Sequence, residues 1–188
     1  PVFVKESELD PQKVNALFAS DFEGLRNSLI VELFYQTGMR LSELIDLKDA
    51  AVNQQYIKVL GKRNKERLIP IAPELLLKIN QYRAAKRALG LDHPNLLLRI
   101  NGQALYAQLV YRLVKEVLGT LSGVEKRSPH VLRHTFATHM LNNGAGLETL
   151  KDLLGHANLS ATQVYTHNSF AQLRKAYGSA HPRALKTP

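Results

Sequence analysis

Apolar residues recur at helical spacing through the first third of the chain, and this pattern restricts the fold more than any other feature. The residues form two groups within which steps of three and four positions recur. The first is Val14, Leu17 and Phe18, and the second is Leu25, Leu29, Ile30, Leu33 and Phe34. Such spacing is typical of helices that bury one face in a core. Thr37-Gly38 is expected to end the second helix, because glycine accepts the left-handed conformation of a helix C-terminus. Arg40 then falls at a helix junction.

One stretch departs from the helical period. Residues Tyr56 to Leu60 and Arg67 to Ile69 are short β-prone runs on either side of a basic segment, which predicts a β-hairpin with a basic tip. Ser128 is interpreted as an N-cap and Gly155 as a helix stop. Further helices are expected from Pro73, over Gln103 to Leu118, Pro129 to Asn142, Leu147 to Leu154 and Phe170 to Tyr177. The pattern therefore predicts one mixed but mainly helical domain.

The composition narrows the classes of partner. Lys and Arg number 25 against 16 Asp and Glu, a formal net charge of +9, so a polyanion such as nucleic acid is a natural partner. The chain has no cysteine, which excludes disulfides, a thiol nucleophile and thiolate metal sites. No apolar run approaches the ~20 residues of a membrane span. We therefore expect a cytoplasmic protein without a membrane partner.

Several residues could carry chemistry, although each alone is weak evidence, because surface Arg and Lys are usually solvated. They are Arg40, Lys62 on the hairpin tip, His130 with Arg133, and His156 nine residues before Tyr165. His130 and Arg133 are neighbours on one helical face, near an N-terminus whose dipole favours anions. Guanidinium groups from Arg133 and Arg40 could bind a phosphate and neutralise the charge that grows during attack on phosphorus. Tyr165 would supply the nucleophile.

Four motifs occur in order along the chain. They are Thr37-Gly38-Met39-Arg40-Leu41-Ser42-Glu43-Leu44, Gly61-Lys62 followed by Asn64-Lys65-Glu66-Arg67, His130-Val131-Leu132-Arg133-His134-Thr135-Phe136-Ala137-Thr138-His139, and Leu154-Gly155-His156 leading to Tyr165-Thr166-His167. Together they resemble the catalytic domain of the tyrosine recombinases, or phage integrase family, and most of all its Xer-type members. The likeness extends from about Arg26 to Tyr177. It implies a mainly α-helical fold with a small antiparallel β-sheet, of the α+β class.

The resemblance also implies an activity, site-specific DNA recombination or integration. Tyr165 would attack the scissile DNA phosphate, forming a 3′-phosphotyrosyl link and freeing a 5′-hydroxyl, while Arg40 and Arg133 clamp the phosphate. The energy of the phosphodiester would be kept in the protein link, so rejoining would need no cofactor. Positioned cations would stabilise charge in place of metal ions, so activity is expected in the presence of a chelator.

The remaining motif residues receive supporting roles from the same resemblance. Lys62 would protonate the departing 5′-oxygen; Lys65 on the same tip is the competing lysine, and both could merely contact phosphates. His130 would exchange protons with the tyrosine hydroxyl. His156 would hydrogen-bond the phosphate, and Glu43 would hold neighbouring catalytic side chains in place.

The resemblance extends to domains and partners. Residues 1–188 are expected to form a single C-terminal catalytic domain, with a linker and entry helix over 1–20 and a C-terminal helix and tail over 170–188. The start at Pro1 without a methionine suggests a piece of a longer protein. The resemblance implies that an N-terminal core-binding domain normally precedes this part, and that domain is expected to be absent here. The implied partner is double-stranded DNA, bound by a homotetramer or a paired heterotetramer, and the isolated domain is expected to be monomeric.

The C-terminal helix has two possible arrangements. Relatives pass this helix to a neighbouring protomer, and Phe170, Leu173 and Tyr177 offer anchors at helical spacing for such a contact. The same anchors would equally serve a helix that docks on its own domain. In an isolated piece without DNA the segment could also be disordered, because fixed partners are what offset the entropy cost of ordering.

The sequence suggests three other interpretations. His130 and His134 have the spacing of metal-binding helices, but no glutamate stands between them and Arg133 would repel a dication, so no zinc site is predicted and His134 and His139 are interpreted as structural. A noncatalytic helix-turn-helix DNA-binding regulator across residues 129–154 is a different-class alternative. A type IB topoisomerase, which uses similar tyrosine chemistry, is the second enzyme alternative.

Overall fold

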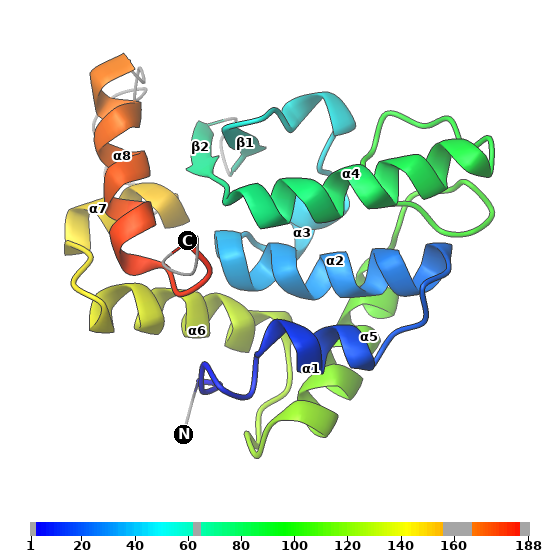
Figure 1. Ribbon diagram of the computed structural model, residues 1–188, viewed down its shortest axis with the longest axis horizontal. Coiled ribbons are helices and arrows are strands. Elements are labelled where there is room, and N and C mark those ends of the chain that lie inside the picture. Colours follow the sequence, from blue (N-terminus) through cyan, green and yellow to red (C-terminus); the bar gives the residue numbers. More distant parts are fainter. Residues whose placement is uncertain (1–2, 62–64, 156–166, 185–188) are drawn as a thin grey trace.

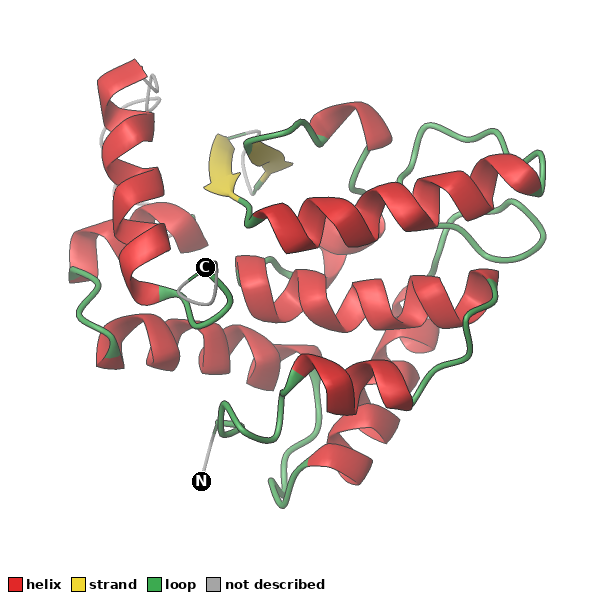
Figure 2. Ribbon diagram, viewed as in Figure 1, coloured by secondary structure: helices red, strands yellow, loops and turns green. Residues whose placement is uncertain are grey.

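The computed structural model describes residues 3–61, 65–155 and 167–184. In chain order its elements are α1 (Pro11–Ala16), α2 (Phe22–Thr37), α3 (Leu41–Ile45), the short 3-10 helix η1 (Asp49–Ala51), β1 (Tyr56–Leu60), β2 (Glu66–Pro70), α4 (Pro73–Ala88), α5 (Ala107–Leu121), α6 (Pro129–Asn142), α7 (Leu147–Leu154) and α8 (His167–Ala180). Helices dominate, with a two-stranded antiparallel sheet at one edge (Figure 2), which confirms the predicted fold class. Among the described helices, none has both the length and the apolar character that crossing a bilayer requires.

Helix α2 forms the centre of the fold, with α4 packed along one side and α6 along the other (Figure 1). Asp21 caps its start by accepting a hydrogen bond from the Gly24 N–H at 2.8 Å. Gly38 ends it in the left-handed conformation, with φ of 61°, as predicted. The helix is buried on nearly all sides, so even the polar residues Glu32 and Gln36 are enclosed. A single apolar stripe therefore understated its burial.

The predicted hairpin is confirmed. Tyr56 pairs with Pro70 at one end of the ladder and Leu60 with Glu66 at the other. Alternate side chains of the two strands are buried, namely Ile57, Val59, Arg67 and Ile69, with Pro70 at the end of β2 also enclosed. The tip residues, Lys62 among them, lie outside the described residues.

Several predicted boundaries need correction. The helix predicted from Gln103 begins instead at Ala107, because Leu98 and Ala104 form a bridge around a turn at Gly102. The last helix is longer than predicted, since α8 spans His167–Ala180. Leu17 is 36% exposed rather than core, because α1 has already ended. Ser128 occupies the N-cap position of α6, but its side chain makes no capping hydrogen bond.

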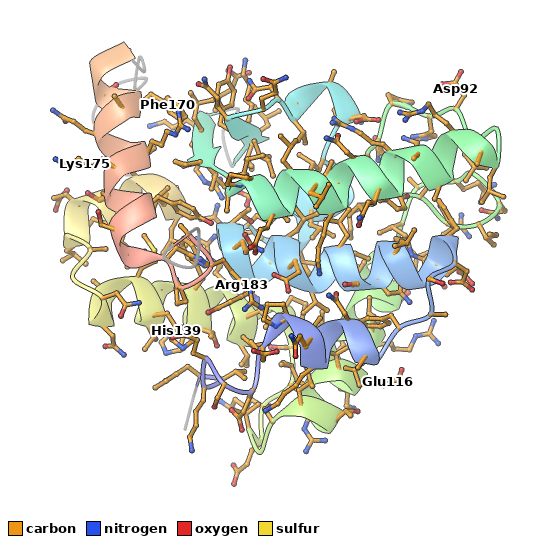
Figure 3. All side chains as sticks on the ribbon, in the orientation of Figure 1. Asp92, Glu116, His139, Phe170, Lys175 and Arg183 are labelled. Atoms are coloured by element: carbon orange, nitrogen blue, oxygen red, sulfur yellow. The ribbon has the colours of Figure 1, made fainter. Side chains whose placement is uncertain are left out.

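Helix α8 packs on its own domain in this single chain, one of the two arrangements left open by the sequence. Leu173 and Tyr177 are buried, and the Tyr177 hydroxyl donates to the Gln36 carbonyl at 2.9 Å. The Phe170 ring lies 5.3 Å from the Tyr56 ring of β1. Figure 3 shows Phe170 on the side of α8 that faces the hairpin and Lys175 on its outer side. Two of the predicted anchors are thus core residues here, and the third contacts the sheet.

The segment after α8 continues into the interior. His181 is fully buried, with Nε2 3.1 Å from the Tyr35 carbonyl, and burial lowers its pKa to about 3. Arg183 lies next to α2 (Figure 3), where its guanidinium pairs with the buried Glu32 carboxylate at 3.1 Å. A central ion pair therefore joins α2 to residues close to the end of the described chain.

Candidate active site

Two helices, α3 and α6, bring the described candidate residues together. Arg40 is the N-cap of α3 and Glu43 lies in the first turn of that helix. Arg133 lies in the first half of α6, whose N-terminus is set by Pro129. The other three catalytic candidates, Lys62, His156 and Tyr165, lie outside the described residues.

Glu43 connects two arginines of the site through its carboxylate. Its carboxylate accepts hydrogen bonds from the Arg40 backbone N–H at 2.6 Å and from Arg40 Nη1 at 2.8 Å. On its other side Arg67, which the ladder places on the buried face of β2, donates from Nη1 to Oε1 at 2.8 Å and from Nη2 to Oε2 at 2.9 Å. This parallel pairing is the bidentate geometry that guanidinium and carboxylate groups favour. Glu43 therefore fixes Arg40 to the strand that follows the hairpin tip.

Arg133 reaches the same place from α6. Its Nη2 donates to the Leu154 carbonyl at 2.8 Å and its Nη1 to the Gly38 carbonyl. Arg40 Nη2 lies 3.4 Å from the next carbonyl, that of Gly155. The two predicted phosphate-binding arginines, 93 positions apart in the sequence, thus meet at the C-terminal end of α7. His156 follows Gly155 directly in the chain.

The charges of this cluster are unbalanced. Three guanidinium groups, from Arg40, Arg67 and Arg133, stand around the single carboxylate of Glu43. Burial alone would raise the pKa of Glu43, but its bonds and attraction to Arg67 and then Arg40 lower it to about 2. Burial, with the charges of Arg40 and Arg67, lowers the pKa of Arg133 to about 10. Arg133 therefore stays protonated at neutral pH, in a positive field that an anion would relieve.

The histidines of α6 have different environments. His130, at the second position of the helix, is exposed and one turn before Arg133. His139 is buried, and its Nδ1 lies 3.0 Å from the Tyr35 hydroxyl, which fits the predicted structural role. His134 is exposed, and its predicted structural role stays a prediction. Within the described part of the chain, no group of three or more His, Asp or Glu side chains is arranged to hold a metal ion.

Arg67 belongs to one of the four motifs, but no role for it was predicted from the sequence. Its side chain is 5% exposed and touches both Glu43 and the end of α7. The one signal in the sequence was its position two residues before Ile69, which places an arginine on the inward face of the predicted strand. A charged residue at such a position has to find a partner in the interior.

The sequence of one protein family matches most of the chain. The phage integrase family matches residues 7–172. The chain belongs to that family. Tyrosine recombinase XerC of Staphylococcus carnosus is 45% identical over 182 residues, covering 93% of this chain and 62% of the relative. XerC of Staphylococcus haemolyticus is 46% identical, covering 99% of this chain and 63% of the relative. The chain thus spans somewhat less than two thirds of these integrase-family relatives.

Solved structures of the family share the fold. The crystal structure of XerA recombinase superposes with a TM-score of 0.71 at 29% identity, covering 97% of this chain and 66% of that one. XerH recombinase, solved bound to its difH substrate in a pre-cleavage complex, gives a TM-score of 0.75 at 24% identity, covering 94% of this chain and 53% of that one. The helical fold with its small sheet is therefore that of an integrase-family recombinase.

Proposed function

We propose that this chain is the catalytic part of a site-specific DNA recombinase that cuts and rejoins strands through a 3′-phosphotyrosyl intermediate. One observation carries the proposal: Arg40 and Arg133 converge on one spot where guanidinium groups outnumber carboxylates. Such a cluster suits a phosphodiester, whose negative charge increases as a nucleophile adds to phosphorus. Family membership and the XerC relatives support the same activity.

In the proposed reaction the scissile phosphate is transferred from the 5′-oxygen of DNA to the hydroxyl oxygen of Tyr165. The Tyr165 hydroxyl loses its proton to His130 and its oxygen bonds to the scissile phosphorus, while the bond to the 5′-oxygen breaks. Lys62, with Lys65 as the competing lysine, gives that oxygen a proton. His156 would hydrogen-bond a phosphate oxygen beside Arg40 and Arg133. Proton transfer of this kind is worth about 10²–10⁴-fold in rate, and the reverse reaction rejoins the strand.

Further parts of the proposal concern the rest of the protein. Double-stranded DNA is the proposed partner, and the Tn1549 transposon integrase, a structure of similar fold, was solved in complex with circular intermediate DNA. We further propose that an N-terminal domain grips the duplex together with this one, so this chain alone would bind weakly and with steep salt dependence. Assembly as a homotetramer or paired heterotetramer on DNA, and action in the cytoplasm, belong to the same proposal.

The decisive experiment is a search for the covalent intermediate. The chain, and any longer protein that contains it, is incubated at low salt and with a chelator with a pool of nicked suicide duplexes of randomised sequence. A protein–DNA band that survives denaturation and maps to Tyr165 is expected. Tyr165→Phe should remove the band while much of the binding remains. Tyr111→Phe, an exposed tyrosine on α5, is the matched control and should retain it.

Other outcomes would point to the alternatives. Binding without any adduct, before and after mutation, would indicate a noncatalytic regulator. An adduct accompanied by relaxation of a supercoiled plasmid that lacks a recombination site would indicate a topoisomerase. An adduct formed at another residue would refute the assignment of the nucleophile.

A further inference from the structure

The end of α7 is held by three arginines. The carbonyls of the last residues of a helix lack partners within the helix, and here three consecutive ones accept hydrogen bonds from three different side chains. Arg67 Nε donates to Leu153 O at 2.7 Å, and Arg133 and Arg40 donate to the two carbonyls that follow, of Leu154 and Gly155. Positive charge at this end also complements the helix dipole. The exit of the chain from α7 is thereby fixed by side chains from three other elements.

Arg67 differs from the other two arginines in its burial. Its side chain is 5% exposed, against 26% for Arg40. Each of its three guanidinium nitrogens already has an acceptor, one in Leu153 and two in Glu43. Arg67 is therefore not placed to bind a phosphate from solvent. It can act only through the groups that it holds.

Those groups are both parts of the candidate site. Glu43, the bidentate partner of Arg67, also accepts two hydrogen bonds from Arg40. Gly155 packs directly on Arg67, because a Cβ at that glycine would lie 3.0 Å from Arg67 Cδ and 3.1 Å from Nη1. One side chain on β2 thus sets the spacing between α3, which presents Arg40, and the end of α7, from which the chain leads to His156.

We infer that Arg67 is a positioning residue for DNA cleavage, which holds Glu43 and the C-terminal end of α7 at a fixed separation. The inference rests on the proposed function. This positioning role requires a planar guanidinium group that donates hydrogen bonds in two directions, which lysine cannot provide. Arg67→Lys keeps the charge and most of the apolar stem, but it cannot bond Glu43 in bidentate fashion and Leu153 at the same time.

The test separates binding from cleavage. Single-turnover adduct formation is measured at saturating DNA, with DNA affinity measured separately, in the parent, Arg67→Lys and Arg26→Lys. Arg26 is a matched control, because it is also buried, at 4% exposure, and donates to the Leu98 carbonyl away from the site. Arg67→Lys should slow cleavage by about 10²-fold, the size expected for a displacement near 1 Å, with affinity within about threefold of the parent. Arg26→Lys should cleave at the parental rate.

Two further measurements make the test decisive. In a Glu43→Gln background, Arg67→Lys should cost much less than it does alone, because residues that act as one unit are not additive. Backbone amides in the last turn of α7 should exchange with solvent at least about tenfold faster in Arg67→Lys, and not in Arg26→Lys. Parental cleavage in Arg67→Lys, an equal loss in Arg26→Lys, or unchanged exchange in α7 would overturn the inference. A parent without any adduct would refute the proposed function, and exchange would still show whether Arg67 positions α7.

Discussion

Acid should selectively remove the stabilising contribution of Glu43. Its pKa is lowered from an ordinary 4.5 to about 2, and one pKa unit corresponds to about 1.36 kcal/mol. The ionised carboxylate therefore contributes on the order of 3 kcal/mol to the free energy of unfolding at neutral pH. Because the folded pKa is the lower one, this contribution is complete above pH 4.5 and is lost as the pH falls toward 2. Roughly 1 to 2 kcal/mol should be gone by pH 3.5.

The assay is urea unfolding, followed by circular dichroism, of the parent and Glu43→Gln between pH 7 and pH 3.5. At pH 7 the variant should be less stable by about 3–5 kcal/mol, because two arginines lose their buried counter-ion. That difference should shrink by roughly 1 to 2 kcal/mol at the acid end. His181 also destabilises the fold in acid, since its pKa of about 3 keeps it neutral inside, but both proteins contain it and its effect cancels.

Glu116→Gln provides the control for this experiment. Glu116 is exposed on α5 and lies at the edge of the molecule (Figure 3). Its substitution should change stability little, because the side chain is exposed. A Glu43→Gln variant whose difference from the parent stays constant with pH would refute the lowered pKa of Glu43, because Glu43 would then titrate alike in the folded and unfolded chains.

Two further substitutions test the packing around the site. Gly38→Ala should lower the free energy of unfolding by about 1–3 kcal/mol more than Gly90→Ala does. Both glycines have φ near 60°, but a Cβ at Gly38 would lie 2.5 Å from a ring carbon of Phe136, whereas one at Gly90 would meet nothing within 4 Å. Equal losses in thermal unfolding would contradict this prediction. Glu32→Gln should lower the free energy of urea unfolding by about 3–5 kcal/mol, because it leaves Arg183 buried without its carboxylate partner. The control Glu23→Gln, at a side chain that is 52% exposed, should lower it by less than about 1 kcal/mol. Similar losses in the two variants would show that the buried ion pair is not the cause.

Local signals predicted the parts of the fold that short segments decide. Gly38 and Gly155 lie where helices end, because these positions need a positive φ, which glycine adopts readily; the values are 61° and 65°. The hairpin followed from two β-prone runs around a polar turn. The start of α5 could not be predicted in the same way, because a bridge between Leu98 and Ala104 occupies the residues before it. That bridge depends on tertiary packing rather than on the period of the sequence.

The site was predictable only where a motif names single residues. Arg40, Glu43 and Arg133 lie together, as the motifs suggested. The catalytic roles assigned to them and to the other motif residues stay predictions, and Lys62, His156 and Tyr165 lie outside the described residues. The partners that hold the site were not predictable, because they come from distant positions in the chain. Arg67 is 24 residues from Glu43 and 86 from Leu153, and no local pattern specifies such contacts.

The contacts of the arginines differ in a way that matters for anion binding. Arg67 has committed every nitrogen to Glu43 and α7, but the bond from Arg40 Nη2 to Gly155 O is long, at 3.4 Å, and its side chain is 26% exposed. Arg40 could therefore turn Nη2 toward a phosphate while Nη1 and the backbone N–H stay bonded to Glu43. An arginine anchored through one nitrogen and adjustable through the other loses little entropy on binding. The buried pair of Glu43 and Arg67 is what makes that anchoring possible.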